Sequence, residues 1–204
     1  MEQRFTALCL RLGIQPYLVR TTWCLLQEHY SETHRHYHHL AHIEAMLAWL
    51  DSCTPDNERI ELAIWFHDVI YDPKSAFNEE NSARFFETCF GSSLRPGLVE
   101  DVVRLIMATK HGNPRTGPID ENLISDIDLT ILAAAHPNYE AYRLAIRREY
   151  SHVPQPDYIR GRGAVLSHFL QSPIFVTGPF QHLEDRARQN ILAELRQLEV
   201  ADQG

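Results

Sequence analysis

The chain has 204 residues, enough for one sizeable hydrophobic core and too few for two domains of ordinary size. Hydrophobic residues make up 44% and charged residues 23%, close to the average of soluble globular proteins, which excludes a disordered or fibrous protein. The formal net charge of −8 disfavours a broad contact with nucleic acid or an anionic membrane surface. The same net charge is compatible with one small basic pocket that binds a phosphate.

The four cysteines lie far apart and form no Cys-x-x-Cys pair, a pattern typical of reduced thiols in an intracellular protein. No apolar run approaches the roughly 18 residues of a membrane span. The N-terminal stretch 5–12 is short, carries Arg11 and lacks a small-residue cleavage site, so it makes a poor signal peptide. We therefore expect a cytoplasmic protein.

Apolar residues recur at helical spacing along nearly the whole chain, and no alternating strand pattern exceeds four residues. This periodicity predicts a single all-α domain over residues 1–204, built from about ten helices. The expected helices span 5–12, 16–30, a stretch that follows the histidine-rich residues 33–39 and ends near 50, then 58–66, 78–90, 98–110, 120–135, 137–150, 156–171 and 181–198. The β-prone residues 174–177 stand alone and predict an extended connector.

Histidine is the unusual residue of this chain, because six of its twelve histidines fall between His29 and His42. In a helix, His38 and His42 would lie one turn apart on the same face, next to the apolar Ile43. Two imidazoles that enter a core together are costly unless a partner satisfies them. A metal ion is one such partner, and exposed or capping histidines are an equally good interpretation of this segment alone.

A His-Asp doublet, His67 and Asp68, lies inside the most hydrophobic run of the chain, residues 63–72. Aspartate is seldom fully buried without a partner, and the end of a helix disfavours a carboxylate. A cation between the two side chains would resolve both difficulties. A hydrogen-bonded His-Asp pair is the alternative.

A third motif holds two aspartates, Asp126 and Asp128, within a helical pattern. Side chains two residues apart on a helix point to different sides, so at most one carboxylate faces the core. Asp128 aligns with apolar residues such as Ile124, whereas Asp126 aligns with the more polar Asn122. Helical geometry therefore favours Asp128 as the buried carboxylate.

The order of these motifs resembles the HD superfamily of metal-dependent phosphohydrolases, and most closely a group of uncharacterised bacterial members of similar length. The first motif is also similar to the Tyr-His-x-x-x-His segment of cyclic-nucleotide phosphodiesterases. The resemblance covers nearly the whole chain and includes residues 35–38, 66–68, 78–83, 108–111, 126–129, 146–150, 169–170 and 184–190. It implies an HD-domain, phosphodiesterase-like helical bundle.

Carried over position by position, the resemblance implies four metal ligands and one general acid. The ligands would be His42, His67, Asp68 and Asp128, and the general acid would be His38. His38 and His39 could also compete for the place of the first ligand, so that register stays open. The ion would be Mn²⁺, Fe²⁺, Co²⁺, Ni²⁺, Zn²⁺ or Mg²⁺. The implied reaction is attack of metal-bound hydroxide on the phosphorus of a small phosphorylated metabolite, for example a nucleotide.

Phosphate needs positive charge beyond a metal ion, and the candidates for that role are Lys110, His111, Arg35 and Arg162. For the two arginines a surface ion pair is the simpler interpretation. Glu80, beside Glu79, could hold a water of the metal or a second metal ion. Acidic residues favoured at the start of a helix explain both glutamates equally well.

Two other functions compete with hydrolysis. A di-iron oxygenase would need further histidines between the doublet and the last aspartate, and this chain offers only His111 there. A metal-stabilised nucleotide-binding module without turnover is the third hypothesis. We expect a small phosphorylated substrate as the partner, no nucleic-acid polymer and no membrane, and we leave open whether the chain forms a homodimer.

Overall fold

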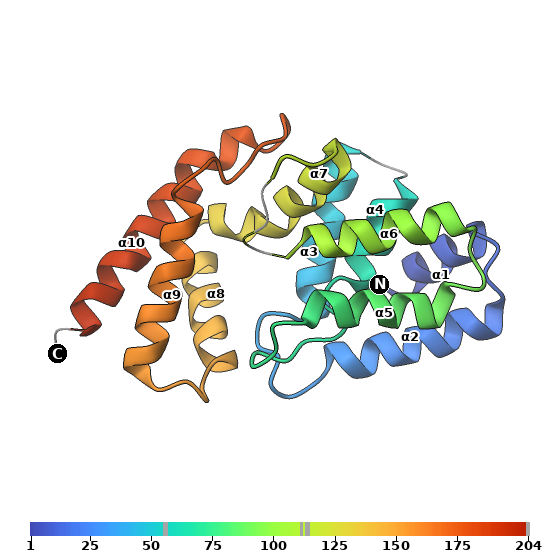
Figure 1. The fold of residues 1–204 in the computed structure, drawn as a ribbon, viewed down its shortest axis with the longest axis horizontal. Helices are drawn as coiled ribbons and strands as arrows, with labels where there is room; N and C mark the ends of the chain where they lie inside the picture. The colour runs from blue at the N-terminus through green and yellow to red at the C-terminus, as the bar shows by residue number, and fades with distance from the viewer. Residues whose placement is uncertain (55–56, 111, 113–114, 203–204) are drawn as a thin grey trace. The chain divides into compact units, whose positions relative to one another are not determined.

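The computed structural model describes residues 1–54, 57–110, 112 and 115–202 (Figure 1). Over these residues the secondary structure consists of ten α-helices and two short 3₁₀ helices, and it contains no strand. The prediction of an all-α fold with about ten helices is confirmed. The chain divides into two compact units, residues 1–113 and residues 114–204.

The first unit is built around α4, which is buried along most of its length. Its helices are α1 (Glu2–Arg11), α2 (Pro16–Tyr30), α3 (Leu40–Cys53), α4 (Glu58–Phe66), α5 (Asn78–Phe90) and α6 (Pro96–Ala108). All seven residues from Ile60 to Phe66 are buried, because α4 packs against α3, α5 and α6. Aromatic rings fill the centre of this core: Phe5 contacts Trp65 at 5.4 Å between ring centroids, and Phe66 contacts Phe90 at 5.6 Å.

Local sequence signals explain where several of these helices begin. Pro16 occupies the first turn of α2, and the Asn57 side chain caps α4 by accepting the Ile60 N–H at 3.2 Å. The observed bounds of α2, α4 and α5 coincide with the predicted ranges 16–30, 58–66 and 78–90.

The predicted helix after the histidine-rich residues 33–39 is confirmed, so His38 and His42 do not share a helix. Helix α3 begins at Leu40, and His39 is its N-cap, with extended backbone and a ring nitrogen that accepts the Ala41 N–H at 3.2 Å. The cap satisfies a free N–H of the first turn and stops the helix one residue after His38. His38 therefore lies in the irregular segment between α2 and α3.

The second unit contains α7 (Ile119–Asp128), η1 (Leu129–Ala133), α8 (His136–Glu149), α9 (Gln155–Phe169), η2 (Gln181–Leu183) and α10 (Glu184–Asp202). The long helix α10 packs against α9 and η1 (Figure 1). The predicted helix 120–135 stops early, because the chain tightens into a 3₁₀ turn directly after Asp128. Residues 174–177 belong to neither a helix nor a strand, which agrees with the connector that their sequence predicts.

The burial of the two aspartates of α7 is the reverse of the prediction. Asp126 is completely buried, whereas Asp128 is only half-buried. The Asp126 carboxylate accepts the backbone N–H groups of Val176 at 3.2 Å and Thr177 at 2.8 Å, together with the Arg115 guanidinium at 2.6 Å. These partners reach Asp126 from the distant connector, which the periodicity of α7 alone does not show.

In the part of the chain that the structure describes, no helix combines the length and the apolar character that a membrane crossing requires. The four cysteines are free thiols, of which Cys9 is buried and Cys24 is exposed.

Candidate metal centre

Two neighbouring helices of the first unit carry the central residues of the site. His42 lies in the first turn of α3, and His67 and Asp68 directly follow α4, which packs against α3. The doublet continues the buried run of α4, because Val69 directly after it is also buried. His42 and His67 are 6% and 1% exposed, and the Asp68 side chain is 17% exposed.

The three side chains converge on one point. The Asp68 Oδ2 atom lies 3.0 Å from His67 Nε2 and 3.9 Å from His42 Nε2. The two imidazoles each offer a ring nitrogen within 4.8 Å of the other. A carboxylate and two imidazoles at this separation form a donor set that suits a borderline divalent cation. The structure thus brings together three of the four ligands that the sequence predicts.

The hydrogen bond of the other His67 nitrogen defines the tautomer of this ring. His67 Nδ1 lies 3.0 Å from the backbone carbonyl of Ile64, and a carbonyl can only accept, so Nδ1 carries a proton. In the neutral ring Nε2 then presents a lone pair to the Asp68 carboxylate, 3.0 Å away. Two lone pairs at that distance repel unless a cation, either a proton or a metal ion, lies between them. A backbone carbonyl that orients the ring through Nδ1 is also the usual arrangement of a metal-binding histidine.

The charge of Asp68 follows from the same neighbours. Burial by itself raises the pKa of this carboxyl, but the attraction of His67, its hydrogen bond and the further attraction of His38 and His42 outweigh the burial. The net effect holds the pKa of Asp68 well below its ordinary range. Asp68 is therefore an anion at neutral pH.

His38, the predicted general acid, lies beside this group although it is outside α3. Its ring stacks on the Tyr71 ring at 4.2 Å between centroids and lies 6.1 Å from the His42 ring. The stack orients the imidazole. Tyr71 is itself held in place by its backbone carbonyl, which accepts a hydrogen bond from His34 Nε2 at 2.8 Å.

Glu80 and Lys110 are brought together as an ion pair. Lys110 Nζ donates to Glu80 Oε1 at 2.5 Å and to the Ala76 carbonyl at 2.9 Å, and it lies 3.8 Å from Glu79 Oε2. This pairing holds the pKa of Glu80 below and that of Lys110 above its usual value. His111, the other predicted phosphate ligand, lies outside the described residues.

Arg35 and Arg162 both lie inside the protein. Arg35 donates to the backbone carbonyls of Asp68 and Val69. Arg162 belongs to the second unit, where its Nε donates to Glu194 Oε1 at 2.8 Å and its guanidinium lies over the Tyr142 ring at 5.3 Å. Asp128, the fourth predicted ligand, also belongs to the second unit.

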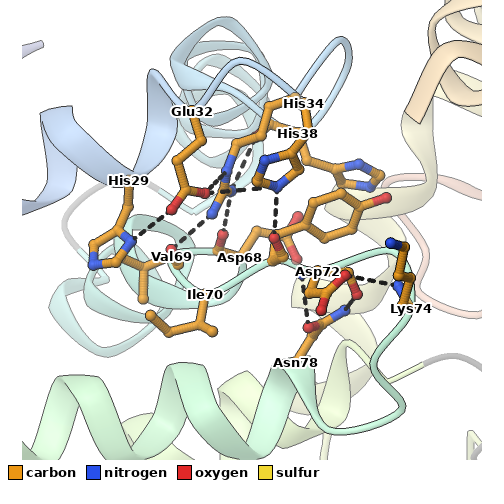
Figure 2. Close-up of polar contacts among 12 residues, drawn as sticks. His29, Glu32, His34, His38, Asp68, Val69, Ile70, Asp72, Lys74 and Asn78 are labelled. Carbon is orange, nitrogen blue, oxygen red and sulfur yellow. Dashed lines mark hydrogen bonds and ion pairs between the residues drawn. The ribbon is translucent and has the colours of Figure 1, made fainter. Parts of the chain in front are cut away.

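Sequence reasoning missed the residues that shape the chain after the doublet. The Ser82 hydroxyl accepts the Ile70 N–H at 3.1 Å, and the Asn78 side chain bonds the backbone of Asp72 through both its oxygen and its nitrogen (Figure 2). Both residues lie on the first turns of α5. The segment 78–83 was singled out for its glutamates and for its resemblance to the HD superfamily, and neither indicates the backbone contacts of Asn78 and Ser82.

Comparisons with known proteins add no relative to this picture. No family model, no curated protein and no solved structure matches the chain.

Proposed function

We propose that this protein binds one divalent metal ion through His42, His67 and Asp68 and hydrolyses the phosphate ester of a small metabolite. The observation that supports it most strongly is the His67 tautomer. Nδ1 donates to the Ile64 carbonyl, and Nε2 faces the Asp68 carboxylate at 3.0 Å. A metal ion satisfies both groups and matches the usual orientation of ligand histidines. The order of motifs that resembles the HD superfamily supports the same reaction class.

A bound ion would supply the Lewis acidity that withdraws charge from a phosphoryl oxygen and lowers the pKa of a coordinated water. The residues of the chain supply the remaining functions. His38, which stacks on Tyr71, would hold the proton that the leaving oxygen needs. Lys110 offers a partly exposed ammonium group that can exchange its bond to Glu80 for one to a phosphate. Asp128 is proposed as the fourth ligand from the sequence resemblance alone.

Elemental analysis of the purified protein tests the metal proposal directly. We expect close to one metal ion per chain in the wild type and a loss of that metal in His67→Ala. His36→Ala is the matched control, because His36 belongs to the same histidine-rich segment but is exposed. A protein that stays metal-free after addition of Mn²⁺ or Co²⁺ would refute the proposal.

A phosphatase screen with the metal that is found tests the reaction class. We expect phosphate release that is lost in His67→Ala and strongly reduced in His38→Ala, whereas His38→Ala retains the metal. Tight nucleotide binding without phosphate release would instead identify a binding module. Two iron ions per chain together with oxygen consumption would identify an oxygenase.

A further inference from the structure

Arg35 is the most completely engaged cation near the candidate metal centre. It lies in the irregular segment between α2 and α3, and its side chain is fully buried. Four donor contacts involve its guanidinium, and three of them end on backbone carbonyls. A charged side chain without solvent exposure needs such partners, because an isolated buried charge is very costly.

The three carbonyls belong to the two segments that carry the site. Arg35 Nη1 donates to the carbonyl of Asp68 at 2.6 Å and to that of His38 at 3.1 Å, and Nη2 donates to the carbonyl of Val69 at 2.8 Å. One rigid, planar group therefore fastens the turn after α4 to the segment before α3. Figure 2 shows this region, with Glu32, His38, Asp68 and Val69 labelled.

The charge and position of Arg35 are themselves secured by neighbours. Its Nε donates to Glu32 Oε2 at 2.9 Å, which provides the compensating negative charge. The guanidinium carbon lies 5.2 Å from the Tyr30 ring centroid and 5.5 Å from that of Tyr71. These two aromatic rings and the Glu32 carboxylate restrict the movement of the guanidinium, so it stays bonded to the carbonyls.

We propose that Arg35 is a positioning residue of the metal site, which holds the Asp68–Val69 backbone and His38 in the arrangement that metal binding requires. This inference rests on the proposed metal binding and assigns Arg35 a role other than phosphate contact. The fork of two N–H groups on adjacent carbonyls orients the peptide on which the Asp68 side chain stands. Lysine keeps the charge but lacks the fork, so it cannot reproduce this geometry.

The experiment measures Co²⁺ affinity and the visible spectrum of the Co²⁺ protein for wild type, Arg35→Lys and Arg35→Ala. Arg4→Lys is the control, because Arg4 makes a comparable bidentate pair with Asp51 in the same unit. We expect Arg35→Lys and Arg35→Ala to bind Co²⁺ about 10- to 100-fold more weakly than wild type, as for other residues that orient metal ligands. We also expect an altered Co²⁺ spectrum, which a mere loss of stability does not cause. Arg4→Lys should match the wild type in both.

Glu32→Gln is a milder variant, which keeps the test possible if Arg35→Ala does not fold. It retains a hydrogen-bond acceptor for Arg35 but removes the compensating charge, and we expect a smaller loss of Co²⁺ affinity in the same direction. Wild-type affinity and spectrum in folded Arg35→Lys and Glu32→Gln would overturn the positioning role while metal binding itself stands. A wild-type protein that binds no Co²⁺ would overturn the proposed function and, with it, this inference.

Discussion

At the scale of single residues, Asp126 shows how a carboxylate is stabilised inside this protein. It is completely buried and accepts bonds from Arg115 and from the backbone of Val176 and Thr177. Asp126→Ala leaves the Arg115 charge and two N–H groups without their partner. We expect it to lower the free energy of unfolding by about 3–5 kcal/mol, the cost of breaking a buried ion pair.

Urea denaturation followed by circular dichroism measures this effect. Asp157→Ala is the control, because Asp157 is exposed and pairs with Arg160 at the surface, where such pairs contribute about 0–1 kcal/mol. Equal stabilities of the two variants would show that the Asp126 network does not hold the connector.

Residue-scale reasoning from sequence succeeded where local chemistry decides the outcome. The doublet was singled out because a carboxylate in an apolar run needs a partner, and Asp68 does lie 3.0 Å from His67. It failed for Asp126 and for Arg35, whose partners come from segments far away in the chain. The spacing of residues along one helix predicts which residues share a face. It does not predict which distant segments of the chain pack against that face.

At the scale of elements, the Lys110–Glu80 pair links the first turn of α5 to the residues that follow α6. The bond to Lys110 lowers the pKa of Glu80 below 4.5, and the bond to Glu80 raises the pKa of Lys110 above 10.5. Because its pKa is lowered, the Glu80 carboxylate stabilises the fold above pH 4.5, and this contribution is lost as the pH falls through the lowered pKa. Because its pKa is raised, the Lys110 ammonium group stabilises the fold below pH 10.5, and this contribution is lost as the pH rises through the raised pKa. The ion pair therefore stabilises the fold between these two limits.

NMR titration of the Glu80 carboxyl carbon checks this prediction. We expect a pKa below 4.5 in the wild type and a return toward 4.5 in Lys110→Met, because the main cause of the shift is removed. Arg84→Met serves as a control, since Arg84 is only a minor cause. An unchanged pKa in Lys110→Met would show that the pair does not persist in solution.

The bounds of the elements were predictable where a proline or a capping side chain marks them, as at Pro16 and Asn57. The start of α3 also agrees with the helix predicted after residues 33–39, although His39 caps it with a ring nitrogen, which is not the usual capping group. The end of α7 was not predictable, because its pattern continues past Asp128, where the chain changes to a 3₁₀ turn.

At the scale of the whole molecule, metal binding should stabilise whichever unit supplies the ligands. A metal ion that binds only the folded state adds about 2.7 kcal/mol at a free concentration of 100 times its Kd. Backbone amide hydrogen exchange, measured with and without the metal, shows which residues are stabilised. We expect slower exchange around His42, His67 and Asp68 in the first unit.

The same measurement tests Asp128 as the fourth ligand. If Asp128 binds the ion, the metal should also slow exchange around α7, and Asp128→Asn should abolish that change while the first unit keeps its protection. Protection confined to residues 1–113 would remove Asp128 from the ligand set.

The sequence by itself determined the all-α class, most of the helices and the residues that gather at the doublet. Helical periodicity and the cost of a polar group in an apolar run are local properties, so they can be deduced from neighbours in the chain. Only the tertiary structure decided that Asp126 is the buried carboxylate of α7 and that Arg35 binds carbonyls beside the doublet. Each of these outcomes depends on a hydrogen-bond partner or a backbone conformation that the spacing of residues along the chain does not encode.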